Sequence, residues 1–456
     1  MAETGVKNDK NSGFSDRLGF ILASAGSAVG LGNIWRFPYL AAKYGGGAFL
    51  LTYIILALTI GFSLSLAEIA LGRKTGKSSA TAFGSLDRRF SFVGYLCLAI
   101  PVLVIPYYSV IGGWVIKYAI TYLFGGGQVL AEDGYFESFT SSVGEPMLLF
   151  LIFLFLTVSV VGLGVKGGIE RISKLLMPPL LAFTLFIAVY TLFSVDGAVE
   201  GLKYYLLPNF DNFSIMTVVV ALGQLFYSMS IAMGVLITFG SYTSKDISIE
   251  KSVRYVEIFD TGVAFLSGLM IIPAVFAFLG PSGTAEGAPL MFITLPRIFV
   301  GMRGGGIIGA IFFTIVILAA LTSNIALAEA FVAMLSDKFK MSRNKALIIA
   351  AALFLAFGIP SSLGYGPLAG IRLFGMGILD MFDFFSSNII MPIIALFTAV
   401  LVGYIITPRP LVEEIELNGE FKHKRLFTAT VRYLAPPFIL IVLVSTFLDL
   451  FGVISI

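Results

Sequence analysis

Long apolar blocks with few charged residues run through the chain from one end to the other. Residues 48–71 and 175–195 are examples, and each block is about as long as the ~20 residues that a helix needs to cross the hydrocarbon core of a bilayer. Backbone amides in lipid need partners within their own segment, so such blocks must be α-helices. The sequence therefore predicts an all-α polytopic membrane protein, with residues 1–456 forming one transmembrane domain.

The composition supports this class and excludes several others. Of the 456 residues, 57% are hydrophobic and 12% are charged, whereas soluble domains carry about 25% charged residues. The only cysteine is Cys97 and the only histidine is His423, which excludes a disulfide framework and a thiolate metal cluster. No histidine falls in a span, and no nucleophile or metal-ligand motif appears. We therefore expect neither an enzyme nor a nucleic-acid partner.

Hydropathy over windows of about 19 residues predicts eleven transmembrane helices. They cover residues 16–40, 46–72, 90–124, 147–164, 171–194, 214–240, 253–280, 305–337, 343–358, 376–405 and 431–452. The segment 287–302 contains two prolines and predicts a further, short helix on the outer face. The first 17 residues are polar and carry no signal-peptide pattern, so we expect the first span to be retained.

Lys and Arg are distributed unequally between the two sets of loops. With the N-terminus in the cytoplasm, 23 of the 30 lie in cytoplasmic segments, in agreement with the positive-inside rule. We therefore expect a multi-pass protein of the inner (plasma) membrane. Its N-terminus would be cytoplasmic and, after eleven spans, its C-terminus would lie outside.

The first span is interrupted by small residues. Gly26, Gly30 and Gly32 lie in mid-membrane, where each costs a helix about 1 kcal/mol relative to alanine. Close helix packing through a small-xxx-small pattern would explain Gly26 and Gly30. However, Gly30 and Gly32 lie on different faces, and the polar Asn33 follows directly. An unwound stretch with exposed carbonyls explains the whole cluster better.

The sixth span has a similar interruption. Its residues are Gln224, Tyr227, Ser228, Ser230, Ala232, Met233 and Gly234. Spans 1 and 6 are five apart, so they hold equivalent positions in two five-helix halves. Interrupted helices in matching positions indicate a transporter binding site, a rule that was itself drawn from the family named below. Freed carbonyls suit a hard cation, and half-helix N-termini suit a carboxylate.

Other polar residues also fall inside predicted spans. They are Glu68, Asp260, Thr322, Ser323 and Asn324. Buried carboxylates in a membrane are costly and therefore indicate function, whereas residues 322–324 also suit polar contacts between helices.

These residues, in this order, resemble the neurotransmitter:sodium symporter family and its bacterial amino-acid transporter branch. The resemblance is carried by residues 26–33, Trp35-Arg36-Phe37-Pro38, 45–49, Tyr107-Tyr108, 224–234, Leu321-Thr322-Ser323, Asp380 and Asp383. It implies a LeuT-like fold, with 5+5 inverted repeats at about 16–194 and 214–405 and broken helices 1 and 6. An extra helix at about 431–452 completes eleven transmembrane helices; the twelfth span common in the family is absent.

The resemblance also implies two sodium sites made of oxygen ligands, which suit a hard cation. One would use the carbonyls of Gly26, Val29 and Ala319 and the hydroxyls of Thr322 and Ser323. The other would use the Ala28 carbonyl, the side chains of Asn33 and Ser228, and the substrate carboxylate. Asp260 falls where the family usually has Asn in this second site. Its negative charge would replace the chloride that animal members need, so we expect chloride-independent transport.

The implied substrate-binding residues surround the two breaks. They are Ala28, Gly30, Gly32, Val104, Tyr108, Tyr227, Ser228, Ser230, Met233, Asn324 and Leu327. Tyr108 would bond the substrate carboxylate and Tyr227 would cover the site. Amine-carrying relatives have an aspartate at the position of Gly30, so its absence points to an amino acid. Mostly apolar walls with a flexible Met favour a hydrophobic side chain, without ranking Leu, Tyr and Trp.

Two gates are implied. Arg36 and Asp383 would form the outer gate, and Asp337 would join Tyr242 and Ser241 in the inner gate. The family's inner-gate arginine aligns with Asn11, for which Lys10 or Arg17 are possible substitutes. Glu68 would accept from amides freed in the break of span 6.

The resulting hypothesis is a sodium-coupled symporter that imports a hydrophobic L-amino acid by alternating access. A sodium-linked amino-acid sensor of the same fold, without net transport, is the alternative that the sequence leaves open. A channel fits less well, because the polar residues cluster at mid-depth instead of forming a continuous pore. The sequence does not indicate the oligomeric state.

Overall fold

The computed structural model describes residues 13–211, 213–280, 289–451 and 453. In these residues the fold is helical, and β-pairing is confined to the isolated bridges Gly46–Pro208 and Leu373–Met376. Nine helices of the described part are long and apolar enough to cross a membrane, and a bent pair near the N-terminus makes a tenth span. The all-α, multi-span prediction is therefore confirmed.

The nine long helices agree with nine of the predicted spans. They are Gly47–Thr75 (α3, Gly47–Leu56, and α4, Phe62–Thr75), Arg88–Leu123 (mostly α6, Ser91–Leu123), Gly144–Gly162 (α8), Val165–Ser194 (with α9, Arg171–Ser194), Ile249–Leu279 (α13), Gly305–Phe339 (α15), Arg343–Leu363 (α16), Ile378–Ile405 (α17, Ile378–Asp383, and α18, Met391–Val400) and Lys424–Leu450 (α20, Lys424–Ala429, and α21, Ala435–Leu450). With 35 residues, α15 is about 50 Å long at 1.5 Å per residue, so it extends beyond the bilayer or tilts within it.

Short helices occupy the connections. They are α5 (Ser79–Leu86), α7 (Tyr135–Ser141), α10 (Ala198–Leu206), α14 (Leu295–Gly301) and α19 (Arg409–Ile415). The helix predicted over 287–302 appears as Leu290–Gly301, which contains α14; residues 287 and 288 lie outside the described residues. The other four are shorter than a 19-residue hydropathy window, which is why that window did not detect them.

The first span is broken where the glycines predicted it. Helix α1 (Arg17–Ala28) ends at Ala28, and the chain resumes as the helix Gly32–Lys43, which contains α2 (Phe37–Lys43). The two halves are bent by 54°. Asp16 caps the start of α1, since its carboxylate accepts from the Gly19 N–H at 2.6 Å.

The sixth span is broken in the same way. Helix α11 (Ile215–Ser228) and helix α12 (Val235–Ser241) are separated by residues 229–234. In this break, φ is positive at Ser230, Ala232 and Gly234, so the chain turns through left-handed conformations that end the helix. The span predicted over 214–240 is thus two short helices, and a total of eleven spans stays a prediction.

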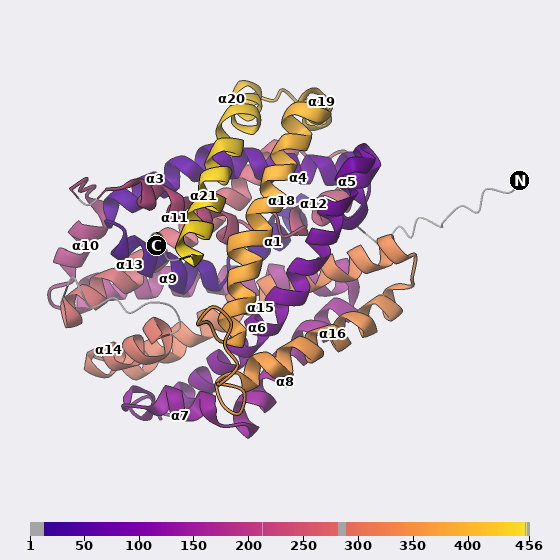
Figure 1. Ribbon diagram of the computed structural model, residues 1–456. Helices are drawn as coiled ribbons and strands as arrows, with labels where there is room; N and C mark the ends of the chain where they lie inside the picture. Colours follow the sequence, from indigo (N-terminus) through magenta and orange to yellow (C-terminus); the bar gives the residue numbers. More distant parts are fainter. Residues whose placement is uncertain (1–12, 212, 281–288, 452, 454–456) are drawn as a thin grey trace, which may run out of the picture.

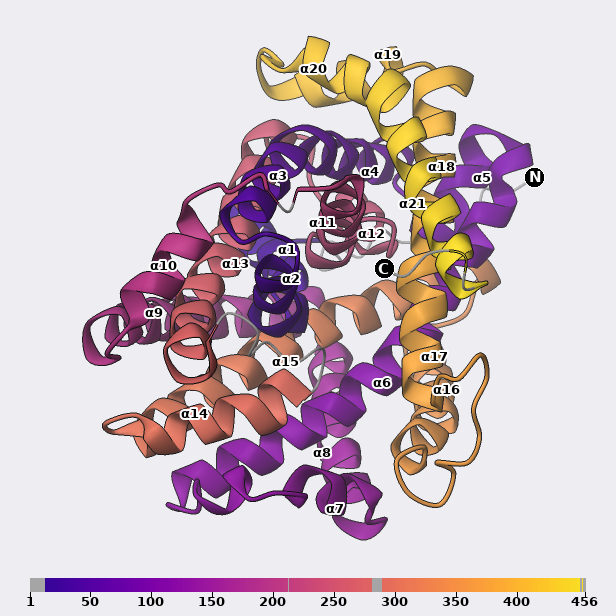
Figure 2. The same cartoon turned by 60° about the vertical axis from the view of Figure 1, so that its left-hand side comes forward.

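The broken helices lie in the middle of the bundle (Figures 1 and 2). Helix α1 packs against α9, α13 and α15, and α12 packs against α4 and α15. Among the described elements, the most extensive contact is between α6 and α15. Enclosure by these helices lets the breaks keep exposed backbone groups at membrane depth, which lipid would not allow.

Candidate substrate and sodium sites

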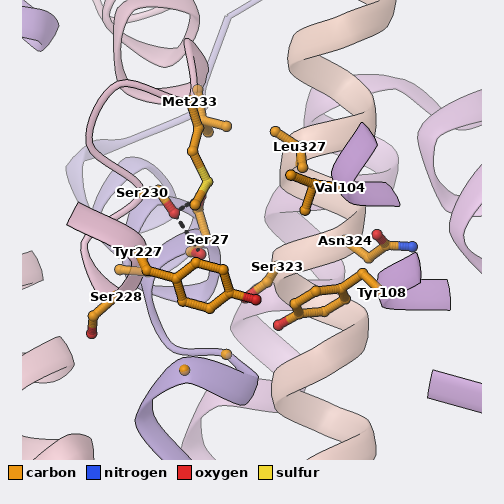
Figure 3. A pocket seen from close by; sticks show the side chains of 14 residues that line it. Ser27, Val104, Tyr108, Tyr227, Ser228, Ser230, Met233, Ser323, Asn324 and Leu327 are labelled. Carbon is orange, nitrogen blue, oxygen red and sulfur yellow. Dashed lines mark hydrogen bonds between the residues drawn. The ribbon is translucent and has the colours of Figure 1, made fainter. Parts of the chain in front are cut away.

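A cavity lies between the two breaks and the facing sides of α6 and α15 (Figure 3). All eleven residues predicted to bind substrate line it. They are Ala28, Gly30, Gly32, Val104, Tyr108, Tyr227, Ser228, Ser230, Met233, Asn324 and Leu327. Ser27, Val235 and Ser323 line it as well, and its volume is about 30 Å³. The sequence analysis did not assign Ser27 or Val235 to the substrate pocket.

Ser27 and Ser230 join the two breaks directly. The Ser230 hydroxyl donates to the Ser27 carbonyl at 2.9 Å, and the Ser27 hydroxyl donates to Ser230 Oγ at 3.1 Å. Both residues are buried. The contact fixes one break relative to the other, and its only sequence signal is the position of Ser27 one residue before the Ala28–Asn33 stretch.

The polar end of the cavity centres on the Tyr108 hydroxyl. This oxygen accepts from the Leu31 N–H at 2.9 Å, and the hydroxyl can itself donate to a carboxylate. A Cβ on Gly30 would lie 2.5 Å from the same hydroxyl and 2.7 Å from Ser323 Oγ. A side chain at position 30, acidic or otherwise, would therefore displace Tyr108 or Ser323 from these positions.

The other end of the cavity is mostly apolar. Val104, Met233 and Leu327 provide hydrocarbon and sulfur surface, and Asn324 lies between Val104 and Tyr108 in the view of Figure 3. This end suits the side chain of a hydrophobic ligand.

The predicted outer-gate residues lie on a second cavity. It has a volume of about 120 Å³ and is lined by Arg36, Tyr107, Tyr227 and Asp383, among others. Tyr227 lines both cavities and therefore stands between them. The Arg36 guanidinium lies 5.0 Å from the centre of the Tyr227 ring. Asp383 accepts from Tyr107 and from Ser387, each at 2.9 Å. In this conformation Arg36 and Asp383 thus use other partners, and their pairing stays a prediction.

The residues predicted for one sodium site lie together where α15 meets the break of span 1. The Ser323 hydroxyl lies 3.1 Å from the Gly26 carbonyl and 3.0 Å from the Val29 carbonyl. Thr322 Oγ1 lies 3.1 Å from the Ala319 carbonyl. The structure thus gathers five uncharged oxygens on two elements, a donor set that fits a hard monovalent cation.

Residues predicted for the second sodium site lie around Asp260 in α13. Asn33 Nδ2 donates to Asp260 Oδ1 at 2.7 Å and to Ser228 Oγ at 2.9 Å, and Ser228 donates to Asp260 Oδ1 at 2.8 Å. Asn33 Oδ1 accepts from the Gly30 N–H at 3.0 Å. A sodium ion bound to Asn33 Oδ1 would therefore share that oxygen with Gly30.

Tyr53 is a neighbour of this site that the sequence analysis missed. Its hydroxyl donates to Asp260 Oδ2 at 3.3 Å, and its side chain is fully buried. A single Tyr within an apolar block gives no sequence signal for such a role.

The freed backbone of both breaks finds side-chain partners. Glu68 Oε1 accepts from the Ala232 N–H at 2.8 Å, as expected for a carboxylate facing an unwound segment. Gln224 Nε2 donates to the Gly32 carbonyl at 2.9 Å. A residue of α4 thus supports the break of span 6, and a residue of α11 supports the break of span 1.

At the predicted inner gate, Tyr242 and Asp337 have different partners. The Tyr242 hydroxyl donates to Glu329 Oε1 at 3.2 Å, while Asp337 accepts from Ser78 Oγ at 2.9 Å and from Thr81. Asp337 and Tyr242, which were predicted to act together, are therefore not hydrogen-bonded to each other in this conformation. The Tyr242 hydroxyl donates to Glu329 instead.

The remaining predicted inner-gate residues are also placed elsewhere. Ser241 donates to the carbonyl of Thr238 at 2.6 Å in its own helix. The Arg17 guanidinium lies 5.3 Å from the centre of the Tyr255 ring. Lys10 and Asn11 lie outside the described residues.

Glu329 is a carboxylate beside the predicted inner-gate residue Tyr242 that the sequence analysis overlooked. It is fully buried and accepts from Arg343 at 2.7 Å and 2.5 Å. Its position inside a predicted span was a usable signal, since carboxylates at membrane depth indicate function.

Comparison with known proteins decides the family. The model of the sodium:neurotransmitter symporter family matches residues 11–126 and 134–452. The chain belongs to this family. An uncharacterized sodium-dependent transporter of Bacillus subtilis (strain 168), YhdH, is 34% identical over 451 residues, 97% of this chain and 98% of that protein. The human sodium- and chloride-dependent GABA transporter 2 is 25% identical over 468 residues, 88% of this chain and 74% of that protein.

A solved structure of the family is similar throughout. The crystal structure of MhsT in complex with L-phenylalanine superposes with a TM-score of 0.87 and 36% identity, covering 95% of this chain and 99% of MhsT. This similarity confirms the LeuT-like fold. As a member of the sodium:neurotransmitter symporter family, the protein is a multi-pass, sodium-coupled transporter and not an enzyme.

Proposed function

We propose that this symporter imports a hydrophobic L-amino acid together with two sodium ions, by alternating access and without chloride. The observation that carries the proposal is the single cavity between the two breaks, which all eleven expected substrate residues line. The adjoining oxygen clusters at Ser323 and Asp260 support the sodium sites.

The substrate assignment rests on the two ends of the cavity. The Tyr108 hydroxyl can donate to an α-carboxylate. Gly30 provides no acid that could bind the amine of a substrate lacking a carboxylate, and a side chain there would meet Tyr108 and Ser323. Val104, Met233 and Leu327 offer apolar surface to the side chain. The related MhsT holds L-phenylalanine in its crystal structure.

Two sodium ions would supply enough free energy for strong accumulation. Each charge that crosses 100 mV contributes about 2.3 kcal/mol, so two ions contribute about 4.6 kcal/mol from the voltage alone. This corresponds to roughly a thousand-fold accumulation of substrate, at about 1.4 kcal/mol per factor of ten. Coupling requires that ions and substrate stabilise the same state.

Alternating access would move the two halves of the bundle about the fixed site. The repeats at about 16–194 and 214–405 are the proposed units, with the segment at 431–452 outside them. Arg36 and Asp383 would close the outer side above Tyr227, and Tyr242, Asp337 and Glu329 would close the inner side. The inner side would face the cytoplasm together with the N-terminus, and the C-terminus would lie outside.

The test is uptake by the purified protein in liposomes. Radiolabelled hydrophobic amino acids are offered with an inward sodium gradient, without sodium, and with the gradient collapsed by a sodium ionophore. We expect accumulation only with the intact gradient, unchanged when gluconate replaces chloride. Sodium-dependent binding without accumulation would instead identify an amino-acid sensor.

A further inference from the structure

The amide of Asn324 presents an unpaired oxygen to the substrate cavity. Asn324 is 1% exposed and lines the cavity. Its Nδ2 donates to Ser109 Oγ and to Thr157 Oγ1, each at 3.0 Å. Its Oδ1 is buried and accepts no hydrogen bond within the part of the chain that the structure describes. Buried acceptors are normally paired, so this one calls for a partner.

Thr157 fixes which end of the amide faces the cavity. Its hydroxyl donates its single hydrogen to the Phe153 carbonyl at 3.1 Å, so Thr157 Oγ1 can only accept from Asn324. If the amide were turned over, its oxygen would face Thr157 Oγ1 with no hydrogen between them. In Figure 3 the oxygen of Asn324 lies on the side of Val104 and Leu327, and the nitrogen points away.

The surroundings of this oxygen restrict its ligand. Val104, Leu327 and Met233 form the apolar end of the cavity, whereas the Tyr108 hydroxyl that would hold the substrate carboxylate has the Leu31 amide as its partner. A ligand that satisfies both features combines an α-carboxylate with an apolar side chain that carries one donor. A purely hydrocarbon side chain would fill the volume and leave Asn324 Oδ1 unpaired.

We propose that the substrate is an aromatic amino acid with a side-chain hydrogen-bond donor, the indole N–H of tryptophan or the phenol O–H of tyrosine, and that Asn324 selects it. This inference rests on the proposed function, because it takes hydrophobic amino acids as the substrate class. Asn324 is the specificity residue, and Thr157 is a positioning residue that acts through it.

Leaving a buried acceptor unpaired costs a ligand about 5- to 150-fold in affinity. Sites built to bond a substrate hydroxyl reject the analogue that lacks it for this reason. We therefore expect the transporter to discriminate between side chains of nearly equal size and shape that differ only in the donor.

The experiment uses matched pairs of ligands as competitors of sodium-driven uptake in liposomes. Tyrosine is compared with phenylalanine, and tryptophan with 3-benzothienylalanine, in which sulfur replaces the indole N–H. We expect the donor-bearing member of each pair to bind at least about 10-fold more tightly. Equal affinities within both pairs would overturn the inference.

Variants of Thr157 test the positioning role. In Thr157→Val the amide keeps only Ser109 as a partner, and a Ser hydroxyl can pair with either end of an amide. The amide can then turn, so the ratio within each pair should fall toward 1 while phenylalanine is still transported. Thr157→Ser keeps the hydroxyl and should restore the ratio. Thr184→Val is the matched control, since Thr184 is equally buried and donates only to the Leu180 carbonyl at 2.7 Å; it should keep the wild-type ratio. A ratio unchanged in Thr157→Val would contradict the positioning role.

Failure of this inference differs from failure of the proposed function. Sodium-driven uptake with no preference within the pairs would reject donor selection and leave the symporter intact. If no hydrophobic amino acid is accumulated, the same pairs are compared by ligand-induced thermal stabilisation of the purified protein. A donor preference there would support the selection by Asn324, and equal stabilisation within both pairs would reject it.

Discussion

Asn33 donates its side-chain amide to the Asp260 carboxylate over 2.7 Å, joining the break of the first span to the middle of α13. Both residues are fully buried. Ser228 donates to the same carboxylate oxygen at 2.8 Å, which brings in the second broken span as well. A single negative charge therefore holds together the three elements that would surround a sodium ion.

The charge of Asp260 leads to a prediction about anions. We expect uptake by the wild type to be unchanged when chloride is replaced by gluconate. Asp260→Asn keeps the size of the side chain and removes the charge, so the apparent sodium affinity should fall by about 10- to 100-fold, the loss typical of hydrogen bonds and contacts to a charged group. Sodium titrations of uptake in both anions measure this. Strict chloride dependence of the wild type would rule out the proposed role.

Ser323 provides a test of the other sodium site. Its hydroxyl lies at 3.0–3.1 Å from the Val29 and Gly26 carbonyls, so Ser323→Ala removes one of five ligands. We expect the sodium concentration for half-maximal uptake to rise about 10-fold. Thr314→Ala is the control, because Thr314 lies on the same helix and donates only to the Ala310 carbonyl at 2.7 Å. Equal effects of the two substitutions would contradict a ligand role for Ser323.

Gly30 is predicted to be intolerant of any side chain. A Cβ there would lie 2.5 Å from the Tyr108 hydroxyl and 2.7 Å from Ser323 Oγ, closer than real contacts allow. Gly30→Ala should therefore abolish substrate binding while the protein still folds. Gly223→Ala on α11 should bind normally, since a Cβ there meets nothing within 4 Å. Ligand-induced thermal stabilisation reports both results; wild-type binding by Gly30→Ala would refute the packing argument.

The sequence predicted the places where a span departs from a continuous apolar helix. Glycines and hydroxyl side chains in mid-membrane predicted both interruptions, and these are present at 29–31 and 229–234. The family resemblance then predicted which residues line the pocket. Local pattern and motif are enough for such features because they depend on residues close together in the sequence.

Features that depend on distant partners were not predictable. Thr157 and Ser109 look like ordinary hydroxyl residues of apolar spans, which usually bond their own helix; only the packing of α8 and α6 against α15 brings them to Asn324. The sequence likewise did not determine which carboxylate pairs with Tyr242. Glu329 and Asp337 lie about two helical turns apart on α15, and which of them Tyr242 reaches depends on the conformation.

Ala232 is predicted to reduce the stability of the protein. Its φ is +65°, a conformation that costs a residue with a Cβ about 1–2 kcal/mol. Ala232→Gly should raise the free energy of unfolding by up to about 1 kcal/mol, since glycine also gains freedom in the unfolded chain. Ala330→Gly, within the regular helix α15, should lower it by about 1 kcal/mol. Thermal unfolding in detergent compares them, and a loss of stability in Ala232→Gly would contradict the strain.

Glu329 and Arg343 give a prediction about the inner side. The Glu329 carboxylate is fully buried, while the Arg343 side chain is 35% exposed and donates to it at 2.5 Å. Arg343→Ala would leave a buried charge without its partner, which typically costs about 3–5 kcal/mol. The double substitution Arg343→Ala with Glu329→Leu removes that charge too, so it should be clearly more stable than Arg343→Ala alone.

Thermal unfolding of the purified protein separates these cases, with Arg409→Ala as the control. Arg409 pairs with Glu413 at 2.8 Å, but the two side chains are 85% and 57% exposed, so their separation should cost less than about 1 kcal/mol. If Arg343→Ala were as mild as Arg409→Ala, the Glu329 carboxylate would not depend on Arg343. Tyr242, which also donates to Glu329, would then be its main partner, and Tyr242→Phe would be the more destabilising change.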